Sequence, residues 1–329
     1  MRNTLKAVLV IIGTLIGAGF ASGQEIYSFF NVYQENGLVG IIVSCLITGV
    51  VIYKVLKLTN NNINSYNELL ERKKSLKPLK QVLSIIINIF LIMSFYIMVA
   101  GFTAYFKQEF NVPNIITAII IVIICYITFM KNIEGIAKIN SIIIPILIVI
   151  VVIIGIKANI FETACNIKLN NIYLSSNWLI KSIEYASYNS ILLLPILIEL
   201  KKYTKNNEKA VSAISAIIFL ILSVTIYLIL HNSGDMSNIE IPIVYIASSF
   251  GSAFKYIYGI VIIFAIYSTM ISAGYGFLTN CTKSARTYRI VALLMCISAI
   301  FISNLSFANL VNSTYPVFGL LGLLQFAII

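Results

Sequence analysis

The residues best suited to form a binding site lie in an apolar segment near the start of the chain, residues 5–26. Four glycines divide this segment, and Glu25 follows them. The glycines are Gly13, Gly17, Gly19 and Gly23. Because glycine destabilises a helix by ~1 kcal/mol relative to alanine, a segment that only crossed a membrane would be more stable with leucine at these positions. The pattern therefore predicts a membrane helix that is interrupted near its centre.

An interruption at Gly17-Ala18-Gly19 would free backbone N–H groups at the start of the second half of this helix. A helix end of this kind favours an anion through its free donors and its dipole, so we expect it to hold an anionic group of a bound solute. The alternative is close helix packing, because Gly13-x-x-x-Gly17 and Gly19-x-x-x-Gly23 have the small-residue spacing of membrane helix contacts. A dinucleotide-binding loop is excluded, since no strand precedes the glycines.

A second segment, residues 176–200, also has a polar centre, at Ser187-Tyr188-Asn189, with Pro195 just beyond it. We therefore expect a second discontinuous helix, whose break faces the first across a solute site. The residues predicted to bind the solute are Gly17, Ala18, Gly19, Phe20, Ser22, Ser187, Tyr188 and Asn189.

Two acidic residues, Glu25 and Glu184, fall within these interrupted segments. Ionisable residues inside membrane spans usually face a cavity, so we expect this pair to gate the site, coordinate a cation or carry a proton. Local roles are the alternative. Glu184 has the i,i+3 spacing for an ion pair with Lys181, and Glu25 could lie near the headgroups.

A third segment, residues 254–280, carries the adjacent hydroxyls of Ser268 and Thr269 at its centre, with Ser272 one turn away from Ser268. Oxygen ligands suit a hard cation such as sodium, and carbonyls freed by a broken helix could complete its coordination. The alternative is that these hydroxyls bond back to carbonyls of their own helix, as is common in membrane spans.

The composition places these segments in a membrane. The 329 residues are 59% hydrophobic and only 11% charged, whereas soluble domains carry about 25% charged residues. The net charge of +11 does not indicate nucleic-acid binding, because the basic residues fall in alternate inter-helix segments. The five cysteines show neither metal-ligand nor disulfide spacing, and no catalytic motif is present, so we expect neither an enzyme nor a resident cofactor.

Ten apolar segments are long enough to span a bilayer as helices. They cover residues 5–33, 37–58, 79–106, 113–130, 138–156, 176–200, 209–230, 254–280, 287–303 and 307–329. Most of the 23 Lys and Arg residues fall on one side of this arrangement, which predicts a multi-pass cell-membrane protein with both termini in the cytoplasm. Five spans precede residues 157–175 and five follow, which predicts a single transmembrane domain, 1–329, of two inverted repeats, about 5–156 and 176–329.

These features resemble a LeuT-fold transporter of the amino acid–polyamine–organocation superfamily, an all-α fold of five-plus-five inverted repeats with discontinuous helices 1 and 6. Within that group, the stretch from Gly17 to Ile26 resembles the opening signature of the YkvI-type bacterial membrane proteins. The resemblance implies a sodium site built from the carbonyls of Gly13 and Ile16 with groups of Ala265, Ser268 and Thr269. Residues 141–154 of the fifth span contain no lysine that could replace the cation.

The sequence thus predicts a sodium-coupled secondary transporter, working by alternating access on a small organic solute such as an amino acid. The alternative from another class is a membrane sensor or assembly protein that keeps the fold without transporting. Binding of a solute without counterflow would identify that alternative.

Overall fold

The computed structural model describes the chain except for residues 1, 61–76, 131–133, 161–176 and 327–329. Within the described residues it is all-helical. The helices are α1 (Arg2–Leu15), α2 (Ala18–Ser22), α3 (Gln24–Phe29), the 3₁₀ turn η1 (Asn31–Tyr33), α4 (Glu35–Asn60), α6 (Lys77–Phe110), α7 (Asn114–Met130), α8 (Glu134–Lys157), α10 (Trp178–Glu199), α11 (Lys201–Thr204), α12 (Glu208–Asn232), α13 (Pro242–Ser249), α14 (Ser252–Cys281), α15 (Ala285–Ile302) and α16 (Phe307–Phe326).

Many of these helices are membrane-compatible. Six of the described helices are long and apolar enough to cross a membrane, namely those at 35–59, 81–110, 208–232, 252–281, 285–302 and 307–326. Isoleucines along one face of α7, including Ile115, Ile119 and Ile123, are exposed, as expected for side chains that contact lipid. The structure therefore supports an all-α multi-pass membrane protein.

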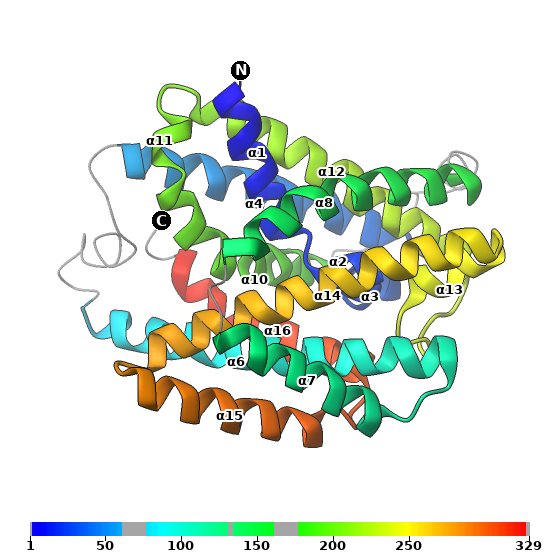
Figure 1. The fold of residues 1–329 in the computed structure, drawn as a ribbon. Coiled ribbons are helices and arrows are strands. Elements are labelled where there is room, and N and C mark those ends of the chain that lie inside the picture. The colour runs from blue at the N-terminus through cyan, green and yellow to red at the C-terminus, as the bar shows by residue number, and fades with distance from the viewer. Residues whose placement is uncertain (1, 61–76, 131–133, 161–176, 327–329) are drawn as a thin grey trace.

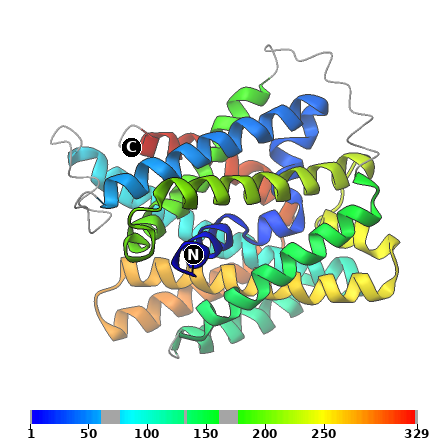
Figure 2. The same ribbon diagram turned by 90° about the horizontal axis from the view of Figure 1, so that it is seen from above.

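The long helices form two groups that run roughly along a common direction (Figure 1). In the first group α4 packs against α10 and α12, and α1 packs against α10 and α12. In the second, α6 packs against α14 and α7, and α7 against α15. Helices α16 and α8 join the groups, because α16 contacts α10 and α6 while α8 contacts α12 and α14. Figure 2 shows α4, in light blue, lying beside α12, in yellow-green.

Two opposite faces close the ends of the helices. The start of α1 contacts α11, and the end of α16 lies on the same side of the molecule (Figure 1, left). We call this the terminal face. The short helix α13 covers the other side, where it contacts α2 and the start of α14 (Figure 1, right). We call this the α13 face.

The predicted break in the first span is present. Helix α1 ends at Leu15, Gly17 has an extended conformation (φ −82°, ψ −177°), and α2 begins at Ala18. A second break follows at Gly23, whose φ of +84° lies in the left-handed region that favours glycine. The first span is thus three short helices, with α2 and α3 on the side of the α13 face.

The predicted break in the sixth span is wrong, because α10 is one continuous helix from Trp178 to Glu199. Its polar centre finds partners without unwinding. The Asn189 amide donates to the Tyr185 carbonyl (2.9 Å) and the Ser190 hydroxyl to the Ser187 carbonyl (2.6 Å). Pro195 lies inside the helix and has no N–H to donate to the Ile191 carbonyl, yet the helix continues to Glu199.

Candidate functional site

A cavity of about 400 Å³ lies at the break between α1 and α2, within the size range of small-molecule sites. Its walls come from the broken span, α6, α10, α14 and α16. The lining residues are Gly13, Thr14, Leu15, Gly17, Ala18, Gly19, Glu25, Ile87, Phe90, Leu91, Ser94, Met98, Tyr188, Asn189, Ile191, Leu192, Pro195, Ile196, Thr269, Ser272, Ala273, Asn280 and Tyr315. Five helical segments distant in sequence therefore converge on one space.

The broken span supplies its backbone to this cavity. Gly17, Ala18 and Gly19, three of the residues predicted to bind the solute, all line it. A Cβ atom built on Gly17 would meet nothing within 4 Å, so this position borders open space. The backbone is accessible here because glycine carries no side chain to cover it.

The carboxylate of Glu25 lies directly over Gly19. A Cβ atom on Gly19 would collide with Glu25 Oε1, so a larger residue at this position would displace the carboxylate. The carboxylate accepts hydrogen bonds from the hydroxyls of Tyr185 (3.4 Å) and Tyr188 (3.3 Å), and from the backbone N–H of Phe20 in the first turn of α2. The start of α2, where we expect an anionic group of the solute, therefore already holds a carboxylate of the protein.

Aromatic rings close the cavity toward the α13 face. Tyr188 stacks on Tyr315 with ring centroids 4.6 Å apart, and Phe90 meets Tyr188 edge-on at 5.8 Å. Behind Tyr188, the buried Tyr185 packs against Phe29 at 5.0 Å. This cluster separates the cavity from the α13 face.

Toward the terminal face the cavity continues along the second halves of α10 and α14. Its lining there includes Pro195 and Ile196 of α10 and Asn280 in the last turn of α14. Ser272 and Asn280 are exposed, so the cavity communicates with this face. The Asn280 amide donates to Asn88 Oδ1 of α6 at 3.0 Å and bridges the two helices at this end.

The residues expected to hold sodium are partly brought together. Gly13 and Thr269 line the same cavity, on α1 and α14. Ile16, Ala265 and Ser268 do not line it, and the Ser268 hydroxyl donates to the Ala265 carbonyl at 3.0 Å.

Other predicted residues lie behind the cavity wall. Phe20 packs on Phe219 with centroids 5.7 Å apart, and the Ser22 hydroxyl donates to the Gly19 carbonyl at 2.7 Å. Both side chains are buried. Neither residue lines the cavity, so each supports the broken span instead of bordering the space.

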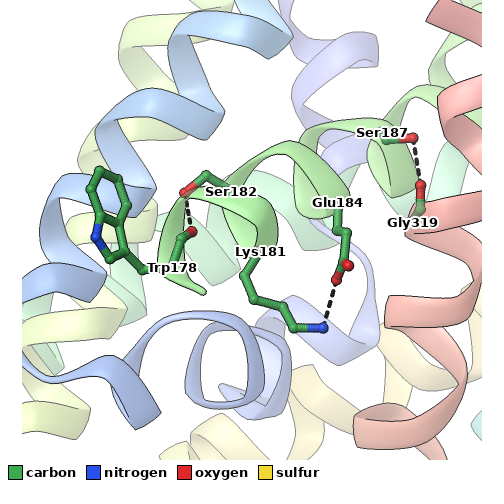
Figure 3. A network of polar contacts seen from close by, with 6 residues as sticks. All are labelled: Trp178, Lys181, Ser182, Glu184, Ser187 and Gly319. Carbon is green, nitrogen blue, oxygen red and sulfur yellow. Dashed lines mark hydrogen bonds and ion pairs between the residues drawn. The ribbon is translucent and has the colours of Figure 1, made fainter. Parts of the chain in front are cut away.

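Glu184 and Ser187 do not line the cavity, and Figure 3 shows Glu184 directed to Lys181 and Ser187 to Gly319. Glu184 forms an ion pair with Lys181 at 2.6 Å. This is the local i,i+3 pairing that the sequence offered as the alternative to a role in the site. The Ser187 hydroxyl donates to the Gly319 carbonyl of α16 at 2.7 Å. Much of the polar centre of α10 thus serves the contact with α16, and Tyr188 and Asn189 alone of the predicted α10 residues reach the cavity.

Several wall residues were not predicted from the sequence. Phe90, Ser94 and Met98 follow one face of α6, while Tyr315 comes from α16. Nothing in the sequence around Phe90 and Met98 distinguishes them from lipid-facing or packing residues, whereas Tyr315 lies in a polar run, Asn312-Ser313-Thr314, before Pro316 that could have marked it. The convergence of α6 and α16 on the break is a tertiary feature.

No family model matches the chain. Two curated proteins of Bacillus subtilis (strain 168) are similar over nearly the full length of both partners. One, called "Uncharacterized protein YyaD", is 27% identical over 330 residues, which covers 98% of this chain and 94% of that protein. The other, called "Uncharacterized membrane protein YkvI", is 24% identical over 329 residues, which covers 97% and 92%.

Solved transporter structures share the architecture. "Inward facing conformation of Mhp1" matches with a TM-score of 0.63 at 15% identity, covering 97% of this chain and 73% of that one. A Na⁺-coupled sialic acid symporter in a substrate-bound outward-open state matches at 0.59, with 18% identity and coverage of 96% and 75%. A manganese transporter of Eremococcus coleocola matches at 0.61, with 16% identity and coverage of 96% and 76%.

The chain therefore has the LeuT-type transporter fold and resembles YkvI, which confirms the expected resemblance. Two of these solved structures are of proteins named as a symporter and a manganese transporter.

Proposed function

We propose that this protein is a cation-coupled secondary transporter that moves a small organic solute by alternating access. One observation carries the proposal. The cavity at the break of the first span is closed toward the α13 face and open toward the terminal face, in a fold used by transporters. A solute site near the bilayer midplane that reaches one side at a time is what alternating access requires.

We propose further that the chain crosses the membrane ten times, as two inverted five-span repeats with both termini in the cytoplasm. The pairwise packing of α4 with α12, α6 with α14 and α7 with α15 supports this arrangement, because each pair would be equivalent spans of the two repeats. Under this orientation the open end of the cavity faces the cytoplasm.

We assign the coupling ion to sodium, held between α1 and α14. Its ligands would be the carbonyls of Gly13 and Ile16, and groups of Ala265, Ser268 and Thr269. Gly13 and Thr269 already face the same cavity, which supports a site at this junction. A cation bound there would tie the movement of α1 to the second helix group.

The function is tested with purified protein in liposomes. A panel of labelled amino acids, amines and other small metabolites is screened by thermal shift with and without sodium, because ligand binding to the folded state raises the melting temperature. Bound solutes then enter counterflow assays. Sodium-stimulated counterflow supports transport, whereas binding without counterflow would instead support a sensor or assembly role.

The sodium site is tested by the double substitution Ser268→Ala with Thr269→Ala. We expect sodium to lose its effect on melting temperature and on uptake, because two hydroxyl ligands are removed. Thr279→Ala on the same helix is the matched control, since its hydroxyl bonds back to the Tyr275 carbonyl (2.9 Å) outside the cavity. Undiminished sodium dependence in the double variant would refute this site.

A further inference from the structure

We infer that the transported solute is an organic cation without a carboxylate, such as an amine or guanidine, and that Glu25 binds its charged nitrogen. The inference rests on the proposed function and names the chemical class of the solute. It follows from the charge, the hydrogen-bond partners and the aromatic lining of the cavity.

In the described part of the chain, the cavity wall carries negative charge without a basic side chain to balance it. Glu25 is the acidic residue in its wall, and no Lys, Arg or His occurs among the described residues that line it. A solute carboxylate entering this space would face Glu25 without a basic side chain to neutralise either group. A solute with a positive nitrogen would meet a carboxylate of opposite charge.

The partners of Glu25 leave it able to accept a cation. Its two carboxylate oxygens receive tyrosine hydroxyls at 3.3 and 3.4 Å, which are long for hydrogen bonds to a carboxylate. The ion pairs among the described residues, Lys181 with Glu184 and Lys255 with Glu109, do not involve Glu25. Because a buried carboxylate is unfavourable without a counter-charge, a bound ammonium would stabilise it more than these neutral donors do.

One backbone donor at the break is already engaged by the protein itself. Phe20 N–H, in the first turn of α2, is directed to Glu25, and Gly19 provides the space in which the carboxylate lies. The protein's own acid thus takes the position expected for the carboxylate of an amino-acid solute. A solute bound beside it does not need a carboxylate.

The aromatic wall fits the same chemistry. Phe90, Tyr188 and Tyr315 line the cavity next to Glu25, and Tyr188 also donates to the carboxylate. Organic ammonium groups are recognised by aromatic faces together with a nearby anion. The remaining lining, including Met98, Ile191 and Leu192, is apolar and suits a hydrocarbon body.

The test uses matched pairs that differ only in the carboxylate: tyramine with tyrosine, isoamylamine with leucine, and agmatine with arginine. Purified wild-type protein is assayed by thermal shift and, for each binder, by counterflow in liposomes. We expect at least one amine to raise the melting temperature while its parent amino acid does not. Glu25→Gln should weaken binding of that amine by about 10- to 100-fold, the range expected for loss of a hydrogen-bonded charge.

Two further variants separate binding from folding. Glu25→Asp keeps the charge on a shorter side chain and should keep the preference for the amine with reduced affinity. Glu199→Gln makes the same chemical change at an exposed residue near the end of α10, outside the cavity, and should bind like wild type. Melting without ligand reports whether each variant is folded, and the wild-type pairs test the inference even where a variant is not.

The outcomes also separate this inference from the proposed function. Counterflow of parent amino acids with no binding of amines would overturn the inference and leave the transport proposal standing. Amine binding that depends on Glu25 but gives no counterflow would support the inference about the ligand and count against transport. Amine binding unchanged in Glu25→Gln, or no binding of any amine, would overturn the inference.

Discussion

The first span and α10 both carry polar groups at their centres, yet only the first span is broken. In the first span the glycines themselves create the break, since Gly17 is extended and Gly23 is left-handed. In α10 the polar side chains satisfy themselves through carbonyls of their own helix and of α16. Polar side chains in a membrane helix therefore do not require unwinding, whereas several glycines near a carboxylate allow it.

The two regions also differ in how their glycine-rich contacts are used. Around α10 the glycines belong to its neighbour α16, where Cβ atoms on Gly319 and Gly322 would lie 2.7 Å from the carbonyl oxygens of Glu184 and Ser187. In the first span Gly19 makes room for the Glu25 side chain instead. Gly319 and Gly322 thus serve helix packing, whereas Gly19 shapes the site.

The largest effect is expected from breaking the packing of α10. Gly322→Val should force α10 and α16 apart, because the new side chain would meet backbone atoms that cannot move away cheaply. Overpacking of this kind costs about 1–3 kcal/mol and occasionally more, so we expect a clear fall in melting temperature and in yield of folded protein. Leu320→Val, at an exposed position of α16, is the control and should melt like wild type. Equal stability of Gly322→Val and wild type would show that this contact is not tight.

A smaller, more selective effect is expected in the first span. Gly19→Ala should displace the Glu25 carboxylate and weaken binding of the best amine by about 10-fold, measured by thermal shift across ligand concentrations. Gly17→Ala is the comparison for folding, since its φ of −82° suits alanine and its Cβ would meet no atom within 4 Å. We expect Gly17→Ala to melt at or slightly above the wild-type temperature. Unchanged amine affinity in Gly19→Ala would argue against a fixed position for Glu25.

The smallest effect concerns the anchor of α3 at the α13 face. The hydroxyl of Tyr27 donates to Asp235 Oδ1 at 2.7 Å, which holds the pKa of this exposed carboxyl below its usual value. When folding lowers the pKa of a carboxyl group, the folded state gains stability at pH values above the unfolded-state pKa. This gain is lost as the pH falls through the folded-state pKa. Tyr27→Phe should therefore melt slightly below wild type at neutral pH, and the difference should shrink as the pH falls through the lowered pKa of Asp235. A difference that persists at low pH would assign the effect to packing of the ring.

The sequence by itself determined the class of protein and the location of the break. Its low charge and long apolar segments require a membrane environment, and the glycine spacing in residues 13–23 marks where a helix is least stable. The stretch from Gly17 to Ile26 also carried the resemblance to YkvI-type proteins, which similarity over nearly the whole chain supports. These properties are local, so they can be deduced from residue type and spacing.

The tertiary structure decided what the polar groups do. The Ser187 hydroxyl bonds to a carbonyl of α16, and Glu184 pairs with Lys181. The Glu25 carboxylate lies over Gly19, where we expected the solute's own carboxylate. The tertiary structure also brought Phe90 to the cavity, although this residue does not stand out in its own helix. A polar group in a membrane helix can be satisfied by its own helix, a neighbouring helix or a solute. Which of these it meets depends on the packing of segments that lie far apart in the sequence.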